Sequence, residues 1–269
     1  MNGEENSKFT LPAANPIYEF ISSPKPVGRW ILYGETPPHT AFMMYKKPTD
    51  EQIKNVLHLL KENDITAIGM CGHTNIQTKE GQETFRKNLL LAKKLGVQYV
   101  TLSTGETHGD ESVIGDDTEL VGIIRDLGKY AAELGLVMAI ETHGNNYATG
   151  QSIIALLKKV NLPNVRLNYD TGNVVFYGGI MPYEDLDSST GSITGIHLKE
   201  KAGAQNEWNF PAIGRGDLDF DRILKTLKKN GCTAALSIEI EFTPAGPNGV
   251  EDVHESLQYS VNTIKKLAA

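Results

Sequence analysis

The chain has 269 residues, enough to bury a large core and close to the length of a single α/β barrel. Lys and Arg number 26 against 33 Asp and Glu, so the formal net charge is −7, and no basic run is long enough to follow a phosphate backbone. We therefore expect neither nucleic acid nor an anionic membrane as a partner.

Cysteine content and hydropathy bear on the compartment. Cys71 and Cys232 are too few for a disulfide framework or a cysteine zinc site, which is typical of a reducing cytosol. No stretch approaches the roughly 18 apolar residues of a membrane span. Residues 1–9 are polar and acidic, whereas a signal peptide is basic and then apolar. We expect a soluble cytoplasmic protein.

From about residue 50, short apolar runs alternate with longer amphipathic segments, which is typical of repeated βα units and a parallel sheet. Strands are predicted over residues 65–70, 98–103, 137–141, 165–169, 193–198 and 233–241. Helices are predicted over residues 82–95, 116–134, 152–160, 220–229 and 250–267, with a short irregular helix near residues 183–186. Asp116 or Asp117 is the expected cap of the second helix.

The first part of the chain departs from this pattern. Residues 10–48 are rich in proline and offer one convincing strand at residues 31–34 and a weaker candidate at residues 18–21. The space between them is too short for a crossover helix, because a βαβ connection needs at least about ten to twelve residues. We predict one (β/α)8 TIM-barrel domain over residues 1–269, with an abbreviated or irregular N-terminal part at residues 1–48.

Four predicted strands carry, at or near their ends, a residue that can bind a metal ion: Glu141, Asp170, His197 and Glu239. The carboxyl ends of parallel barrel strands meet at one face, so these side chains are expected to converge. Three carboxylates at one point repel one another unless a cation or protons neutralise them. The mixed set suits Mn²⁺, Mg²⁺, Co²⁺ or Zn²⁺, and we favour Mn²⁺.

Glu241 competes with Glu239 for the fourth position. Residues two apart on a strand point to the same side of the sheet, so the strand period does not choose between them.

Five phrases in the chain resemble the xylose-isomerase-like barrel superfamily of sugar isomerases and epimerases. They are AIETHGN around Glu141, NYDTGN around Asp170, GIHLKE around His197, IGRGDLDF at 213–220 and LSIEIEF around Glu239. The resemblance implies a TIM barrel whose metal is bound by these four residues, with a ketose or cyclic polyol chelated through neighbouring oxygens. The family's ligand usually follows the Ser-Ile step directly, which favours Glu239 over Glu241.

The resemblance also implies an activity. In related ketose epimerases the two glutamates move the proton, which makes Glu141 and Glu239 the expected catalytic residues. The metal polarises the carbonyl, one carboxylate removes a carbon-bound proton, and the other returns it to the opposite face. We expect a divalent-metal-dependent isomerase or epimerase acting on a sugar, sugar phosphate or cyclitol. Two alternatives stay open: a keto-inositol-type dehydratase, and a sugar-binding barrel without turnover.

Several flanking residues are expected to bind the carbohydrate substrate. The epimerases carry a substrate-binding His where this chain has Asn173, and an Arg a few residues past the metal His, where this chain offers Lys199 and Lys201. The alternative for the two lysines is a surface salt bridge to Glu200 or Glu207.

His73 and His108 follow two of the predicted strands on the ligand rim, and we assign them substrate contacts. In the barrel endonucleases of this superfamily, histidines near these positions bind further zinc ions for cleavage at abasic sites. The acidic balance and Asn173 argue against that activity here.

Arg215 lies in a glycine-flanked segment where barrels often bind phosphate, so it can hold a substrate phosphate or carboxylate, or serve as a solvated turn residue. Four further side chains can wall a sugar site or cover the core: Tyr177, Met181, Trp208 and Phe210. The substrate's identity and a homo-oligomeric state both stay open.

Overall fold

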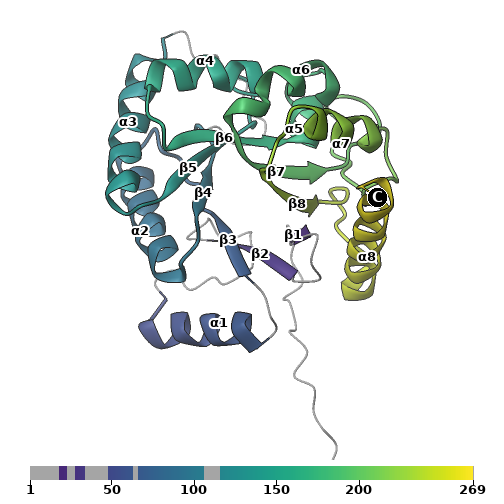
Figure 1. The fold of residues 1–269 in the computed structure, drawn as a ribbon, viewed down its shortest axis with the longest axis horizontal. Coiled ribbons are helices and arrows are strands. Elements are labelled where there is room, and N and C mark those ends of the chain that lie inside the picture. Colours follow the sequence, from purple (N-terminus) through teal and green to yellow (C-terminus); the bar gives the residue numbers. More distant parts are fainter. Residues whose placement is uncertain (1–17, 23–27, 34–47, 63–65, 106–115, 269) are drawn as a thin grey trace, which may run out of the picture.

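The computed structural model describes residues 18–22, 28–33, 48–62, 66–105 and 116–268. Within these ranges the strands form a closed barrel in chain order, with the helices around its outside (Figure 1). The strands are β1 Tyr18–Ser22, β2 Gly28–Tyr33, β3 Thr66–Cys71, β4 Tyr99–Leu102, β5 Val137–Glu141, β6 Val165–Asp170, β7 Ile193–Lys199 and β8 Ala235–Ile240. The predicted TIM-barrel fold is confirmed.

Six of the helices in the described ranges follow predicted segments, whereas α1 and α5 were not predicted. They are α1 Asp50–Glu62, α2 Lys79–Leu95, α3 Thr118–Glu133, α4 Gly150–Val160, α5 Thr171–Phe176, α6 Pro182–Ser189, α7 Phe220–Lys229 and α8 Gly249–Ala268, with a 3-10 turn at Thr190–Ser192. The N-cap of α3 is Asp117, without a side-chain cap hydrogen bond, while the preceding Asp116 accepts the backbone N–H of Thr118 at 2.9 Å. None of the helices in the described ranges is long and apolar enough to cross a membrane.

The first strand runs against the rest of the barrel. Neighbouring strands from β2 to β8 are parallel, whereas β1 is antiparallel to both β2 and β8. Only residues 23–27 separate β1 from β2. An antiparallel pair can be joined by a short turn, whereas a parallel pair needs a crossover connection. The predicted irregularity at the N-terminus is therefore a reversed strand.

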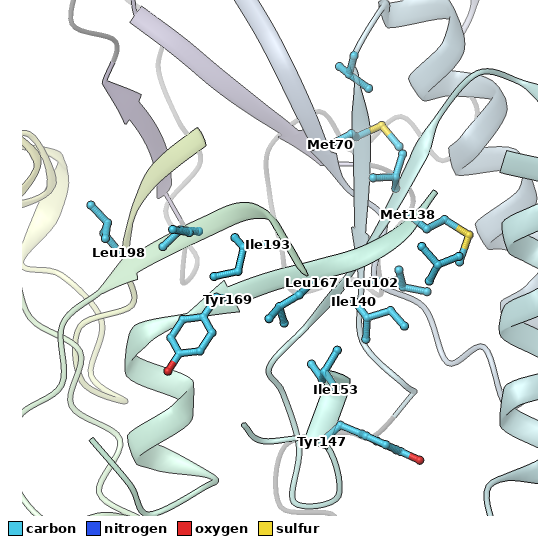
Figure 2. Close-up of a cluster of buried hydrophobic side chains, with 14 of the residues drawn as sticks. Met70, Leu102, Met138, Ile140, Tyr147, Ile153, Leu167, Tyr169, Ile193 and Leu198 are labelled. Carbon is cyan, nitrogen blue, oxygen red and sulfur yellow. The ribbon is translucent and has the colours of Figure 1, made fainter. Parts of the chain in front are cut away.

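Successive residues on a strand belong alternately to two apolar clusters. On β5, Met138 and Ile140 belong to the large apolar cluster between barrel and helices, shown in part in Figure 2. Ala139 belongs to a separate small cluster with Ile68, Cys71 and Tyr99. Because side chains alternate along a strand, Glu141 shares the inner side with Ala139.

The same alternation holds on the next three strands. The large outer cluster contains Tyr169, Ile196, Leu198, Ile238 and Ile240. The residues between or beside them on the strands are Asp170, His197, Lys199 and Glu239, all buried. The apolar pattern that packs the helices on the barrel therefore also turns these polar residues inward.

Candidate metal centre

The four ligand-type residues come together at one point. Each offers one ligand atom, and these four atoms lie within 4.8 Å of one another. Glu141 ends β5 and Asp170 ends β6, while His197 on β7 pairs in register with Asp170. All four side chains are buried. The parallel strands β5 to β8 thus deliver the set expected from the sequence to one face.

Asp170 has one oxygen held by the backbone and one turned to the group. Its Oδ1 accepts the N–H groups of Gly172 and Asn173, each at 2.8 Å, which caps the short helix α5. Its Oδ2 accepts no hydrogen bond from the described residues and lies 3.6 Å from His197 Nδ1. The same side chain therefore caps helix α5 with one oxygen and turns the other toward the group of four.

Glu239 divides its oxygens in the same way. Its Oε1 accepts a hydrogen bond from the Lys199 ammonium at 3.1 Å, whereas its Oε2 lies 2.7 Å from His197 Nδ1 and accepts no hydrogen bond within the described part of the chain. Buried acceptors are nearly always satisfied by a donor or an ion. Together with Asp170 Oδ2, this oxygen gives a carboxylate and imidazole site that fits a divalent cation with hard-ligand preference.

Glu141 has partners on both oxygens. Asn173 Nδ2 donates to its Oε1 at 3.1 Å, and His73 Nε2 lies 3.1 Å from its Oε2. Burial opposes the ionised carboxylate, but the neighbouring His197 and His73 outweigh it and hold the pKa of Glu141 well below its ordinary value. The neighbouring histidines therefore favour the ionised form of this carboxyl group.

The structure separates Glu239, which lies on β8, from Glu241, which follows the end of that strand. Glu239 belongs to the group of four, whereas Glu241 Oε2 lies 2.8 Å from the Lys199 ammonium and outside that group. This geometry favours Glu239 as the fourth ligand.

Both lysines after His197 are buried, so the surface salt bridge considered for them is wrong. The exposed fraction of each residue is 2%. Lys199 lies in the site against Glu239 and Asn173, while the Lys201 ammonium donates to the carbonyl groups of Ala202 and Ala204. Lys201 therefore stabilises the loop that follows it.

A histidine that the sequence reasoning did not single out also lies in the site. The ring of His143 is 6.0 Å from that of His73, and Tyr177 OH lies 3.4 Å from His143 Nε2. His143 follows Glu141 by two residues, so the strand period offered a signal for it. His73 contacts Glu141, and its own side chain is 25% exposed to solvent.

The remaining candidates divide between the site and the periphery. Arg215 lies against helix α8, with its guanidinium 3.2 Å from Glu255 and 4.5 Å from the ring centre of Tyr259. His108 falls outside the described residues. Met181 is partly buried against the main apolar cluster, which agrees with its packing role.

The aromatic candidates form one cluster beside the ammonium. Rings of Trp208 and Phe210 are 5.2 Å apart, and both contact Phe176, which in turn contacts Tyr177. The Lys199 ammonium lies 4.6 Å from the ring centre of Phe210. This cluster borders the site through Lys199.

Comparisons with known proteins agree with the fold. One curated relative is an inosose dehydratase from Clostridium botulinum (strain Alaska E43 / Type E3), 29% identical over 157 residues. That match covers 51% of this chain and 51% of the dehydratase, so the chain spans about half the length of this relative.

Two solved structures share the architecture over most of the chain. The IolI protein with a bound zinc atom has a TM-score of 0.72 at 18% identity, covering 89% of this chain and 87% of that chain. D-Psicose 3-epimerase with D-tagatose, from Clostridium cellulolyticum H10, has a TM-score of 0.67 at 17% identity, covering 82% and 85%. At these identities the likeness concerns the fold.

The family profile described as xylose isomerase-like TIM barrel matches residues 33–262. This range contains seven of the barrel strands wholly or in part, the four ligand-type residues and Lys199. The chain belongs to the xylose isomerase-like TIM barrel family.

Proposed function

We propose that the protein is a divalent-metal-dependent isomerase or epimerase that moves a proton on a carbon beside the carbonyl of a ketose or keto-cyclitol. The observation that carries this proposal is the convergence of Glu141 and Glu239 with Asp170 and His197, with ligand atoms within 4.8 Å. When bound there, a divalent cation would polarise the substrate carbonyl and stabilise the negative charge that develops on it.

The two glutamates supply the proton-transfer groups. They come from β5 and β8, with β6 and β7 between them, so they reach the centre from different directions. Removal of the carbon-bound proton by one carboxylate and delivery of another proton to the opposite face by the second would invert the carbon. Asp170 has its second oxygen occupied by two backbone amides, which suits a ligand better than a base.

The surroundings of the two glutamates favour a second candidate, a dehydratase. Glu239 shares one oxygen with the buried ammonium of Lys199, whereas Glu141 contacts the partly exposed His73. Unequal surroundings suit a reaction with one base. In it, Glu141 would take the carbon-bound proton and pass it to the neighbouring hydroxyl, which leaves as water. The half-length similarity to inosose dehydratases also supports this candidate.

Deuterium incorporation distinguishes the two reactions. The Mn²⁺-loaded protein would be incubated in deuterated water with neutral ketohexoses, a keto-inositol and a ketohexose phosphate, and the products analysed by mass spectrometry after chelation. Isomerisation or epimerisation adds a deuteron beside the carbonyl without loss of water, whereas dehydration removes one water. The matched control is the metal-loaded Glu141→Gln variant, which is expected to do neither. Binding of these compounds without either change would contradict both candidates and favour a binding protein.

A further inference from the structure

Lys199 connects most of the polar groups of the centre. Its ammonium lies 3.1 Å from Glu239 Oε1, 2.8 Å from Glu241 Oε2 and 3.7 Å from Asp170 Oδ2. It also donates to Asn173 Oδ1 at 3.2 Å, and the amide of Asn173 in turn donates to Glu141. One cation thus contacts two of the ligand carboxylates directly and reaches a third through Asn173.

The position of this ammonium is fixed by packing as well as by charge. The stem of Lys199 passes over Gly172, where a Cβ would lie 2.9 Å from Lys199 Cγ. The ammonium lies 4.6 Å from the ring centre of Phe210, whose backbone N–H and carbonyl both pair with Phe242. Burial opposes the charge on Lys199, but Glu239, Glu241 and Asp170 outweigh it and hold its pKa well above the ordinary value.

We propose that Lys199 is a positioning residue that reserves Oε1 of Glu239, so that this carboxylate offers a metal ion only Oε2. The inference rests on the proposed metal-dependent function. Oε2 is the oxygen that lies 2.7 Å from His197 Nδ1 and accepts no hydrogen bond from any residue that the structure describes, whereas Oε1 faces the ammonium. Without Lys199, both oxygens of Glu239 would be available to the cation. Oε1 would then take a coordination position that the substrate needs.

This role predicts opposite changes in metal affinity and turnover. Removing a cation beside the ligands makes the site more negative, and releasing Oε1 adds a ligand atom, so both effects tighten divalent-ion binding. Turnover falls because the second oxygen of Glu239 is no longer kept apart from the metal. A purely structural lysine predicts the reverse for the metal, since a disordered site binds it more weakly.

The effect of the charge of Lys199 can be separated from its contact with Oε1 of Glu239. The separation is possible because Lys199 also pairs with Glu241, a carboxylate outside the ligand group. The double variant Lys199→Met with Glu241→Gln removes one positive and one negative charge and therefore keeps the net charge of the site. If Lys199 acts only through its charge, the double variant restores wild-type metal affinity. If it reserves Oε1, the double variant still binds Mn²⁺ more tightly than the wild type.

The experiment measures free Mn²⁺ by electron paramagnetic resonance during titration of the metal-free proteins. We expect Lys199→Met to bind Mn²⁺ about tenfold more tightly, and the double variant to bind it more tightly than wild type by a smaller factor. Both should show an altered spectrum of bound Mn²⁺ and lose most turnover in the deuterium assay. Lys225→Met is the matched control, because this exposed lysine pairs with Asp221 within α7.

Each result decides the proposal. Weaker Mn²⁺ binding by Lys199→Met, or wild-type affinity and spectrum in the double variant, would overturn the positioning role. If Lys199→Met alone does not fold, the double variant, which removes the Glu241 carboxylate together with its ammonium partner, gives the same test. Absence of Mn²⁺ binding by the wild type would instead contradict the proposed function, and the inference with it.

Discussion

Glu239 near the end of β8 and Glu241 just past it differ in what surrounds them. Glu239 lies in the group of four ligand atoms, whereas Glu241 pairs with Lys199 outside it. We expect Glu239→Gln to lower Mn²⁺ affinity by at least about 100-fold, because a neutral amide replaces a charged ligand. Glu241→Gln should lower it by less than about tenfold, since only a nearby charge is lost. Titration of both metal-free variants checks this order, and unchanged metal affinity in Glu239→Gln would assign the fourth ligand elsewhere.

His73 contacts a ligand without belonging to the ligand group. Its Nε2 lies 3.1 Å from Glu141 Oε2. Loss of a side chain that orients a ligand carboxylate typically costs about 10- to 100-fold in activity or metal affinity. We expect His73→Ala to lower turnover within that range, with a smaller change in Mn²⁺ affinity.

His254→Ala provides the control for this histidine, because His254 is exposed on α8 and touches no ligand residue in the described contacts. Steady-state turnover and metal titration on both variants give the comparison. Equal turnover in the two variants would remove His73 from the reaction.

The sequence predicts the ligands better than their neighbours, for a physical reason. Glu141, Asp170 and His197 each lie at or near the end of a short apolar run, and parallel strands bring such ends together. The contact of Lys199 with Glu239 depends instead on the register between β7 and β8, in which these two residues are paired. Apolar alternation within one strand carries no information on register with its neighbour.

Helices also differ in how well the sequence predicts them. Helices such as α2, α7 and α8 are long enough to show a repeating apolar face, and their positions follow from that period. Helix α5, Thr171–Phe176, has six residues and no such repeat, and it was missed. It begins where Asp170 caps two backbone amides, so a ligand side chain rather than periodicity defines it.

The loop between β7 and α7 is organised by one buried carboxylate. Glu200 accepts backbone N–H groups from Lys201 at 3.1 Å, Gly214 at 2.8 Å and Leu218 at 3.1 Å. Burial raises the pKa of Glu200, although these amides oppose the shift. We expect Glu200→Ala to lower the free energy of unfolding by about 2 kcal/mol, because buried amides lose their acceptor. Urea denaturation measures this loss.

Glu255→Ala is the control for that loop, since its carboxylate pairs with Arg215 at the surface. Exposed ion pairs contribute little, so its stability should hardly change. Hydrogen exchange localises the effect: the amides of Gly214 and Leu218 should exchange faster in Glu200→Ala alone. Unchanged protection of both amides would show that the loop does not depend on Glu200.

At the scale of the whole molecule, the candidate metal centre joins four consecutive strands. Its residues come from β5, β6, β7 and β8, so a bound cation would tie together half of the closed barrel. Three of them are carboxylates, and their mutual repulsion is relieved when the ion binds. The barrel should therefore be more stable with its metal than without it.

An ion present at about 100 times its dissociation constant stabilises the folded state by about 2.7 kcal/mol. For a chain of this length, that corresponds to a rise in Tm on the order of 5 °C. Chelation should lower Tm by this amount, and Mn²⁺ should restore it, as followed by calorimetry. Asp170→Asn should lack the shift, because it loses the charged oxygen that faces His197. A cation that binds only surface carboxylates would stabilise both proteins alike, so an equal shift in wild type and variant would place the ion outside this centre.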